Sequence, residues 1–213
     1  MNIIFIAPPA AGKGTQSKFV SSKYNLEHIS TGDLLREVSL KDDELSREIR
    51  NKMSKGLLIS DEIILKLIKD KIKNNNGFIF DGFPRNLLQA KEFDDLLSEL
   101  NQKIDYVIYL KITEEIARER IVGRMVCPKC GSVYNYGINA LEENHFCKNC
   151  NETLIKRKDD TIETFNKRFE VYMEQTSPII EYYKNQGILY EVDSSVEPND
   201  VFKQIENIIG EKW

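Results

Sequence analysis

The chain has 213 residues, of which 41% are hydrophobic and 30% charged, and its formal net charge at pH 7 is -4. This composition is typical of a globular protein and excludes a disordered or fibrous chain. Apolar runs such as Ile3 to Ala11 are far shorter than the roughly 18 residues that cross a membrane. We therefore expect a cytoplasmic protein that forms one good-sized domain or one domain with insertions, and its acidic balance argues against general binding to nucleic acid.

Apolar segments in chain order predict the strands of a sheet. The first, Asn2 to Ala7, shows no alternation of polar and apolar residues, which is typical of a strand buried on both faces of a parallel sheet. The other expected strands lie around His28 and Ile29 and over Gly77 to Asp81, Asp105 to Leu110 and Ile188 to Val192. Because helical patterns separate these segments, the sequence predicts an α/β fold with a doubly wound, five-stranded parallel sheet.

The sequence also predicts helices, and four of them flank the candidate motifs. We expect them over Lys13 to about Lys23, from Thr31 through Glu37, over about Asp42 to Lys55, and in a long segment that starts near Thr161. Pro178 is expected to kink the last of these, because proline removes a helix hydrogen bond and its ring meets the preceding turn.

A phosphate-binding loop is predicted in the segment Ala7 to Thr15, between the first strand and its helix. Backbone N–H groups in such a loop point at phosphate oxygens, and Lys13 adds a mobile positive charge. The strict pattern G-x-x-x-x-G-K-[ST] fails at Ala7 and at Gly14. The alternative is a glycine turn with a surface lysine, and the position after a buried first strand favours the phosphate loop.

Asp81 ends a predicted strand at the carboxyl edge of the sheet, where α/β proteins bind ligands, and an acid there can hold Mg²⁺ through water. The alternative for this Asp-Gly pair is a simple turn. A set of arginines completes the candidate phosphate site, although scattered arginines can equally be solvated or paired with acids. They are Arg36, Arg85, Arg120, Arg124, Arg157 and Arg168.

The four cysteines form two Cys-x-x-Cys pairs, Cys127 with Cys130 and Cys147 with Cys150. Their spacing matches a zinc pattern, and four thiolates would close a tetrahedral, structural site. Two disulfides are the alternative, which a reducing compartment disfavours.

Only two histidines are present, His28 and His145, and we expect both to be packing or loop residues. Nucleophilic catalysis by histidine therefore has little to work with. Phosphoryl transfer to an acceptor that is already an anion needs positioning and charge neutralisation, which lysine, arginine and Mg²⁺ supply.

Together these motifs resemble the adenylate kinase family, in its long type with a zinc-containing lid. The resemblance rests on the segments Gly12 to Gln16, Ile29 to Asp33, Asp81 to Arg85 with Gln89, Gly123 to Arg124, and Arg157 to Asp160 with Arg168. It implies the reaction ATP + AMP ⇌ 2 ADP with Mg²⁺, and a monomer. It also implies a core of residues 1–29, 60–123 and 162–213, an AMP-binding segment 30–59 and a lid 124–161 with structural zinc.

The resemblance also assigns roles to residues of this chain. The expected ATP-binding residues are Ala10, Ala11, Gly12, Lys13, Gly14, Thr15, Arg120, Arg124, Val133, Tyr134 and Val196. The expected AMP-binding residues are Thr31, Arg36, Leu57, Leu58, Ile59, Gly82, Phe83, Pro84, Arg85, Gln89, Arg157 and Arg168. The expected catalytic residues are Lys13, Asp81, Arg85, Arg124, Arg157 and Arg168, and the metal ligands are Cys127, Cys130, Cys147 and Cys150.

The chain departs from the family pattern at Ala7 and Ala10, where glycine is usual, and at Met125, where a basic residue often follows the lid arginine. Because Pro8 and Pro9 stiffen the turn, we expect Ala10 to keep a negative φ. Two alternatives stay open: a kinase for another nucleoside monophosphate, and a zinc-ribbon binding module on an inactive phosphate loop. The arginine set argues against the binding module, which needs no such constellation.

Overall fold

The computed structural model describes residues 1–55, 57, 59–72, 77–135 and 145–210. Its centre is a parallel sheet with the strand order β2-β3-β1-β4-β7. The strands are β1 (Asn2–Ile6), β2 (Glu27–Ser30), β3 (Phe78–Asp81), β4 (Tyr106–Lys111) and β7 (Leu189–Asp193). The five predicted strands and their parallel arrangement are therefore confirmed.

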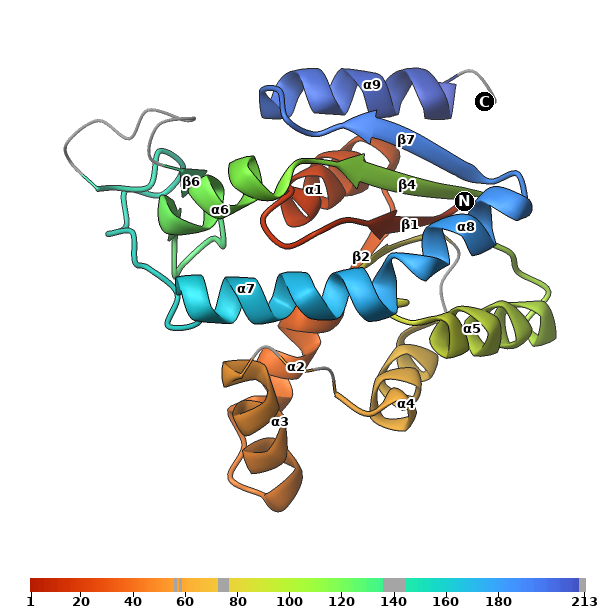
Figure 1. Ribbon diagram of the computed structural model, residues 1–213, viewed down its shortest axis with the longest axis horizontal. Helices are drawn as coiled ribbons and strands as arrows, with labels where there is room; N and C mark the ends of the chain where they lie inside the picture. Colours follow the sequence, from red (N-terminus) through yellow and green to blue (C-terminus); the bar gives the residue numbers. More distant parts are fainter. Residues whose placement is uncertain (56, 58, 73–76, 136–144, 211–213) are drawn as a thin grey trace.

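Both faces of the sheet are buried, as the unbroken apolar run of β1 predicts. Alternate side chains enter two separate clusters, with Ile4 and Phe80 on one face and Ile3 and Ile79 on the other. Helices α1 (Lys13–Tyr24) and α9 (Pro198–Gly210) pack on the second face and contact each other. On the first face lie α4 (Asp61–Ile72), α5 (Leu87–Glu99) and α8 (Pro178–Asn185), so the molecule has three layers (Figure 1).

Two short helices, α2 (Thr31–Ser39) and α3 (Glu44–Ser54), follow β2 and extend away from the sheet (Figure 1). The Ser30 hydroxyl accepts from the backbone N–H of Asp33, and the Asp43 carboxylate accepts from that of Ser46. These side-chain caps explain where the two helices begin, since the first N–H groups of a helix lack partners within it. Both helices were predicted from the sequence.

The long helix expected near Thr161 is present with one interruption. Thr161 caps α7 (Ile162–Val171), a π-helical turn η1 (Tyr172–Thr176) follows, and Pro178 begins α8. The Ser177 N–H donates to the carbonyl oxygen of Tyr172, five residues earlier, at 2.8 Å. The predicted kink is thus a widened turn that ends before the proline, because Pro178 has no N–H to continue the helix.

The remaining helix, α6 (Glu114–Val122), leads into a small antiparallel pair, β5 (Arg124–Val126) and β6 (Val133–Asn135). The strands of the large sheet point towards this pair, so it stands over their carboxyl ends (Figure 1). We call the segment 124–161, which holds all four cysteines, the cysteine segment. Within the described part of the chain, no helix is both long and apolar enough to cross a membrane.

Candidate functional site

A cavity of about 770 Å³ lies at the carboxyl edge of the sheet, between the loop after β1, helix α2 and the cysteine segment. Nine lysine and arginine side chains line it against four carboxylates, although the whole chain has a net charge of -4. The cationic residues are Lys13, Lys18, Arg36, Arg85, Arg120, Arg124, Lys148, Arg157 and Arg168. Positive charge concentrated inside an acidic protein favours a polyanionic ligand.

The loop between β1 and α1 forms the floor of this cavity. Gly12 precedes the helix with φ 85°, in the left-handed region that glycine adopts without strain. The first residues of α1 line the cavity, and the first N–H groups of a helix lack carbonyl partners in the preceding turn. Lys13 lines the cavity too, with its Nζ 3.6 Å from Asp81 Oδ1. Burial lowers the pKa of Lys13, and the charge of Asp81 opposes that effect. A left-handed glycine before a helix N-terminus, with a lysine beside it, is an arrangement that can bind an anion.

The expected negative φ at Ala10 is wrong, because the structure gives φ 63°. Proline fixes only its own φ and restricts the residue before it, so Pro8 and Pro9 leave the next turn residue free to be left-handed. An alanine there costs roughly 1 to 2 kcal/mol. Ala10 packs against the apolar cluster of Ala117, Ile121 and Phe165 on α6 and α7, which offsets part of that cost.

Asp81 stands beside the loop, because β3 and β1 pair with Asp81 opposite Phe5. A Cβ atom at Gly14 would lie 3.3 Å from Asp81 Oδ2, so glycine in place of the usual hydroxyl residue gives this carboxylate room. Burial raises the pKa of Asp81, but His28 and Lys13 outweigh it and hold the value below its usual range. The carboxylate is therefore kept ionised at the edge of the cavity.

His28 is a site residue that the sequence analysis missed. It was expected to serve in packing, yet its Nε2 lies 3.4 Å from Asp81 Oδ2 and it lines the cavity. The strand register gives the reason, since His28 is directly opposite Ile79 and therefore shares a face with Asp81, two residues on. Matching this alternation across the two strands would have found it.

Thr31, Gly82 and Arg85 form a compact corner on the other side of the cavity. The Thr31 hydroxyl donates to the Gly82 carbonyl at 2.9 Å, and Arg85 Nε donates to the same oxygen at 2.7 Å. Gly82 has φ 84°, and a Cβ atom there would lie 2.8 Å from Thr31 Oγ1. Only glycine fits this turn. Burial lowers the pKa of Arg85, and the nearby charges of Arg168 and Arg36 act in the same direction while Asp81 opposes them.

The structure brings most of the remaining expected AMP-binding residues to the same cavity. Leu57, Ile59, Pro84 and Gln89 line it, and Gln89 Oε1 accepts from the Arg85 N–H at 2.7 Å. The side chain of Phe83 does not reach the cavity; it is buried with its ring 4.9 Å from that of Phe93. Leu58 lies outside the described residues.

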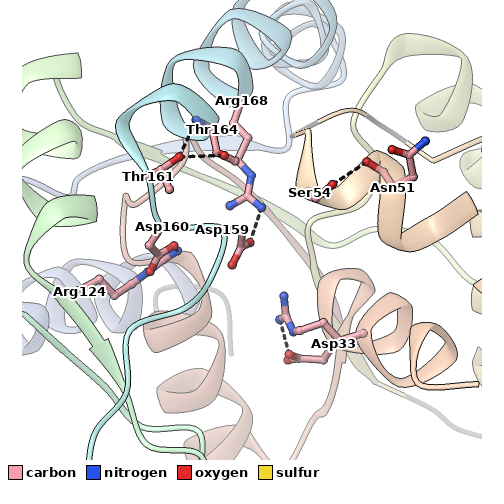
Figure 2. A network of polar contacts seen from close by, with 10 residues as sticks. Asp33, Asn51, Ser54, Arg124, Asp159, Asp160, Thr161, Thr164 and Arg168 are labelled. Carbon is pink, nitrogen blue, oxygen red and sulfur yellow. Dashed lines mark hydrogen bonds and ion pairs between the residues drawn. The ribbon is translucent and has the colours of Figure 1, made fainter. Parts of the chain in front are cut away.

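Three of the arginines are paired with aspartates of this chain (Figure 2). Arg124 donates from Nε to Asp160 Oδ2 at 2.7 Å, Arg168 bonds Asp159, and Arg36 bonds Asp33. The Arg124 pair spans 36 residues within the cysteine segment, the Arg168 pair joins the end of that segment to α7, and the Arg36 pair lies within α2. Each guanidinium is thus held near the cavity by a carboxylate that an anionic ligand can replace.

Arg157 has no ion pair with any carboxylate of the described residues. Burial lowers its pKa, and the charges of Arg124 and Arg36 add to that effect. On the opposite wall Arg120 donates to the carbonyls of Ser194 and Val196, at 2.8 and 3.4 Å. Val133, Tyr134 and Val196 also line the cavity, so the expected ATP-binding residues lie around one space.

The four cysteine sulfurs lie within 4.8 Å of one another. The closest pairs join the two knuckles, Cys127 with Cys150 and Cys130 with Cys147, each at 3.4 Å. These separations are far above the roughly 2.05 Å of a disulfide bond, and all four thiols are free. Four converging sulfurs fit a tetrahedral metal ion, and the donor set suits zinc.

A doubly wound sheet with a glycine-lysine loop at its carboxyl edge, under a cationic cavity, defines a P-loop nucleotide-binding protein. The family model for adenylate kinase matches residues 5–188. The chain is 44% identical to an adenylate kinase of Archaeoglobus fulgidus, over 98% of each chain. It is 42% identical to one of Clostridium tetani, over 99% of each, and 41% identical to one of Kosmotoga olearia, over 98% of this chain and all of that one. The chain belongs to the adenylate kinase family.

Proposed function

We propose that the protein transfers a phosphoryl group reversibly between MgATP and AMP, giving two ADP. The observation that carries this proposal is the single cavity in which a phosphate loop, Asp81 and the arginines converge. Such a cavity has room for phosphates approaching from two sides, and full-length relatives with this name support the choice of substrates.

On the donor side, the loop from Ala10 to Thr15 would hold the phosphates of ATP through backbone N–H groups and Lys13. Arg120 is already fixed by the carbonyls of Ser194 and Val196, so its flat guanidinium can lie against the adenine. Arg124 would reach the phosphates by leaving Asp160. Val133, Tyr134 and Val196 would complete the pocket.

On the acceptor side, AMP would lie between α2 and the corner formed by Thr31, Gly82 and Arg85. Its phosphate would bind Arg36 and Arg85, and its base would lie near Leu57, Ile59 and Gln89. The other residues proposed to contribute are Leu58, Phe83, Pro84, Arg157 and Arg168.

Asp81 is the residue proposed to hold Mg²⁺, through water. Its ionised carboxylate at the edge of the cavity fits this ion, which binds one or two carboxylates together with substrate phosphates. When bound, Mg²⁺ neutralises phosphate charge. Lys13 and His28 flank the carboxylate, with nitrogen atoms 3.6 and 3.4 Å from its oxygens, and both favour its ionised form.

For this reaction the protein has to position the two substrates and neutralise the negative charge of their phosphates. An AMP phosphate is already anionic at neutral pH, so no side chain has to remove a proton from it. Lys13, Arg85, Arg124, Arg157 and Arg168 would surround the transferring group and stabilise its spreading negative charge. Closure of the cysteine segment over the cavity would exclude water, which otherwise competes as the acceptor.

In this mechanism, different segments of the chain have different roles. We propose a core of residues 1–29, 60–123 and 162–213, an AMP-binding segment 30–59, and a lid 124–161 in which zinc on the four cysteines has a structural role. All proposed substrate contacts come from one chain, so a monomer suffices, and the reducing cytoplasm would keep the thiols free for metal.

The deciding experiment measures ADP formation from MgATP with AMP, GMP, CMP and UMP in turn. We expect activity with AMP and at most weak activity with the others. Activity with only a non-adenine acceptor would replace the proposal by a different nucleoside monophosphate kinase. The Lys13→Ala variant, purified in parallel, controls for contaminating kinases, because it should lack the activity.

A further inference from the structure

The hydroxyl of Tyr134 lies against the sulfur cluster of the cysteine segment. Its oxygen is 3.3 Å from Cys147 Sγ, and the backbone N–H of Lys148 donates to the same oxygen at 2.9 Å. Because the oxygen accepts from Lys148, the hydroxyl proton is left to point at the sulfur. The side chain is buried, so water does not compete for that proton.

The same tyrosine belongs to the wall of the nucleotide cavity. Tyr134 is the central residue of β6 and pairs with Met125 of β5, while both neighbours of Met125 are also paired. Next to Tyr134, Asn135 Nδ2 donates to the carbonyl of Arg120, and Arg124 lies opposite Asn135. One short strand therefore connects the sulfur cluster to two arginines of the cavity.

The loops that carry the cysteines reach the cavity as well. Ser132 follows the first pair and Lys148 and Asn149 lie within the second, and all three line the cavity. Asn149 Nδ2 donates to Ser132 Oγ at 2.9 Å, which ties the two loops together beside the nucleotide space. Loss or binding of the metal would thus change the positions of residues that line the nucleotide cavity.

We propose that Tyr134 is a positioning residue that donates a hydrogen bond to the metal-bound thiolate of Cys147, and thereby couples metal occupancy to nucleotide binding. This inference rests on the proposed metal site. A thiolate bound to a metal keeps negative charge on sulfur, and a hydrogen bond to a charged acceptor is stronger than one between neutral groups. Partners of this kind commonly change metal affinity about 10-fold to 100-fold.

The coupling has to be reciprocal, because the free energy of binding two ligands does not depend on their order. If bound metal holds β6 in the conformation that binds nucleotide, it raises the affinity for MgATP by some factor. Bound MgATP must then raise the affinity for the metal by the same factor. Tyr134 is the contact through which that factor would act. Removal of the Tyr134 hydroxyl should therefore lower both the affinity for zinc and the effect of MgATP on that affinity.

The experiment compares wild type with Tyr134→Phe, which removes one oxygen atom, and with Tyr182→Phe as a matched control. The control variant also loses a hydroxyl hydrogen bond, the one that Tyr182 donates to Asp94 at 2.8 Å. Tyr182 lies on α8, at the opposite end of the molecule from β6 (Figure 1). Zinc affinity is measured by competition with a chromophoric chelator, with and without saturating MgATP and without AMP. We expect Tyr134→Phe to bind zinc about tenfold more weakly and to lose most of the MgATP effect, while Tyr182→Phe matches wild type.

Each outcome decides one step. If wild type binds no zinc, the proposed metal site fails. If it binds zinc and Tyr134→Phe binds it equally well within twofold, the role of Tyr134 is overturned while the metal site stands. Should Tyr134→Phe not fold, the wild type still decides, because an MgATP effect on zinc affinity supports the coupling and its absence overturns it.

Discussion

The phosphate loop and the cysteine segment face each other across one cavity, yet they are stabilised in different ways. The loop stands on β1, the central strand, whose neighbours β3 and β4 are buried between two extensive apolar clusters. Among its described residues, the cysteine segment has a buried cluster of four, and two of these are cysteines. Burial of apolar surface fixes the first region, whereas the second is too small for that.

This difference separates the two kinds of damage that a mutation can do. A change at the loop removes charge from a scaffold that remains folded, so it affects chemistry. A change at the sulfur cluster would remove the proposed metal ion that links the two cysteine pairs, so it should affect folding first. Variants in each region should therefore separate loss of activity from loss of stability.

Metal removal should produce the largest effect, confined to the cysteine segment. Structural zinc sites contribute about 10 to 16 kcal/mol of binding free energy in small domains. We expect stoichiometric metal in the purified protein and a lower melting temperature after treatment with a chelator. A Cys127→Ser, Cys147→Ser double variant is the control, and it should melt like the treated protein whether or not chelator is present. An unchanged melting temperature after confirmed loss of metal would contradict the structural role.

Lys13→Ala should lower turnover about 10³-fold while the melting temperature stays close to that of wild type, because the side chain is proposed to contact the transferring phosphates. Lys23→Ala is a matched control on the same helix, where the lysine is exposed and 3.4 Å from Glu206. Steady-state kinetics and a thermal melt on both variants suffice. A folded Lys13→Ala enzyme with normal turnover would refute the phosphate loop.

Arg168→Ala should lower kcat about 10²-fold to 10³-fold and change the affinity for each nucleotide alone by less than tenfold. The reason is that Arg168 is held by Asp159 in the absence of ligand and would meet phosphate mainly in the reacting complex. Kinetics and calorimetric titration separate the two quantities. Arg118→Ala is the control, because Arg118 lies on α6 with its guanidinium 5.7 Å from the ring of Phe165 on α7. An effect on KM alone would make Arg168 an ordinary binding residue.

Asp159→Asn should cost about 0.5 to 1 kcal/mol of stability at neutral pH, after allowance for solvent screening of a partly exposed pair. Burial raises the pKa of Asp159, but Arg168 outweighs it and holds the value below its usual range. A depressed pKa in the folded state stabilises above the unfolded value of about 3.9, and that stability disappears as pH falls through the folded value. The difference between wild type and variant should therefore vanish in acid.

Urea unfolding between neutral and strongly acidic pH measures this difference. Asp200→Asn is the control, because its pair with Lys203 is exposed and should contribute almost nothing. If the difference in unfolding free energy between wild type and Asp159→Asn stays constant down to the lowest pH, the charge of the carboxylate does not stabilise the fold.

Ala10→Gly should have the smallest effect. Relief of roughly 1 to 2 kcal/mol of left-handed strain is offset by loss of the packed methyl group and by greater entropy of the unfolded chain. We expect the free energy of unfolding and the binding of ATP to change by about 0.7 kcal/mol or less, which is threefold in affinity. Ala11→Gly, at a buried position without positive φ, lacks the relief and should be more destabilising. Equal destabilisation by the two variants, or tenfold tighter ATP binding by Ala10→Gly, would refute the strain argument.

The sequence predicted what local pattern determines and missed what tertiary packing determines. The uninterrupted run of β1 and the spacing of the cysteines are local, and both led to the right structure. The φ of Ala10 depends on contacts with α6 and α7, which no neighbouring residue reports. His28 was missed because its position next to Asp81 depends on the register between β2 and β3.

Partner choice was also beyond the sequence. Arg157, Arg168 and the aspartates between them could have paired in several ways, and only the placement of α7 against the cysteine segment selects Asp159 for Arg168. The contact of Tyr134 with Cys147 likewise depends on how two loops fold around four sulfurs.

The carboxylates that occupy the arginines have a consequence for how the enzyme should respond to ionic strength. A bare set of guanidinium groups would gather counterions from solution and release them when phosphate arrives, so its affinity would fall steeply with added salt. Here Asp33, Asp159 and Asp160 already fill that place. Binding then becomes an exchange of one anion for another within the protein, with few dissolved ions taken up or released. The affinity for nucleotides should consequently vary with salt less than the number of arginines in the cavity suggests, and changes in cellular ionic strength should shift this enzyme's substrate saturation only slightly.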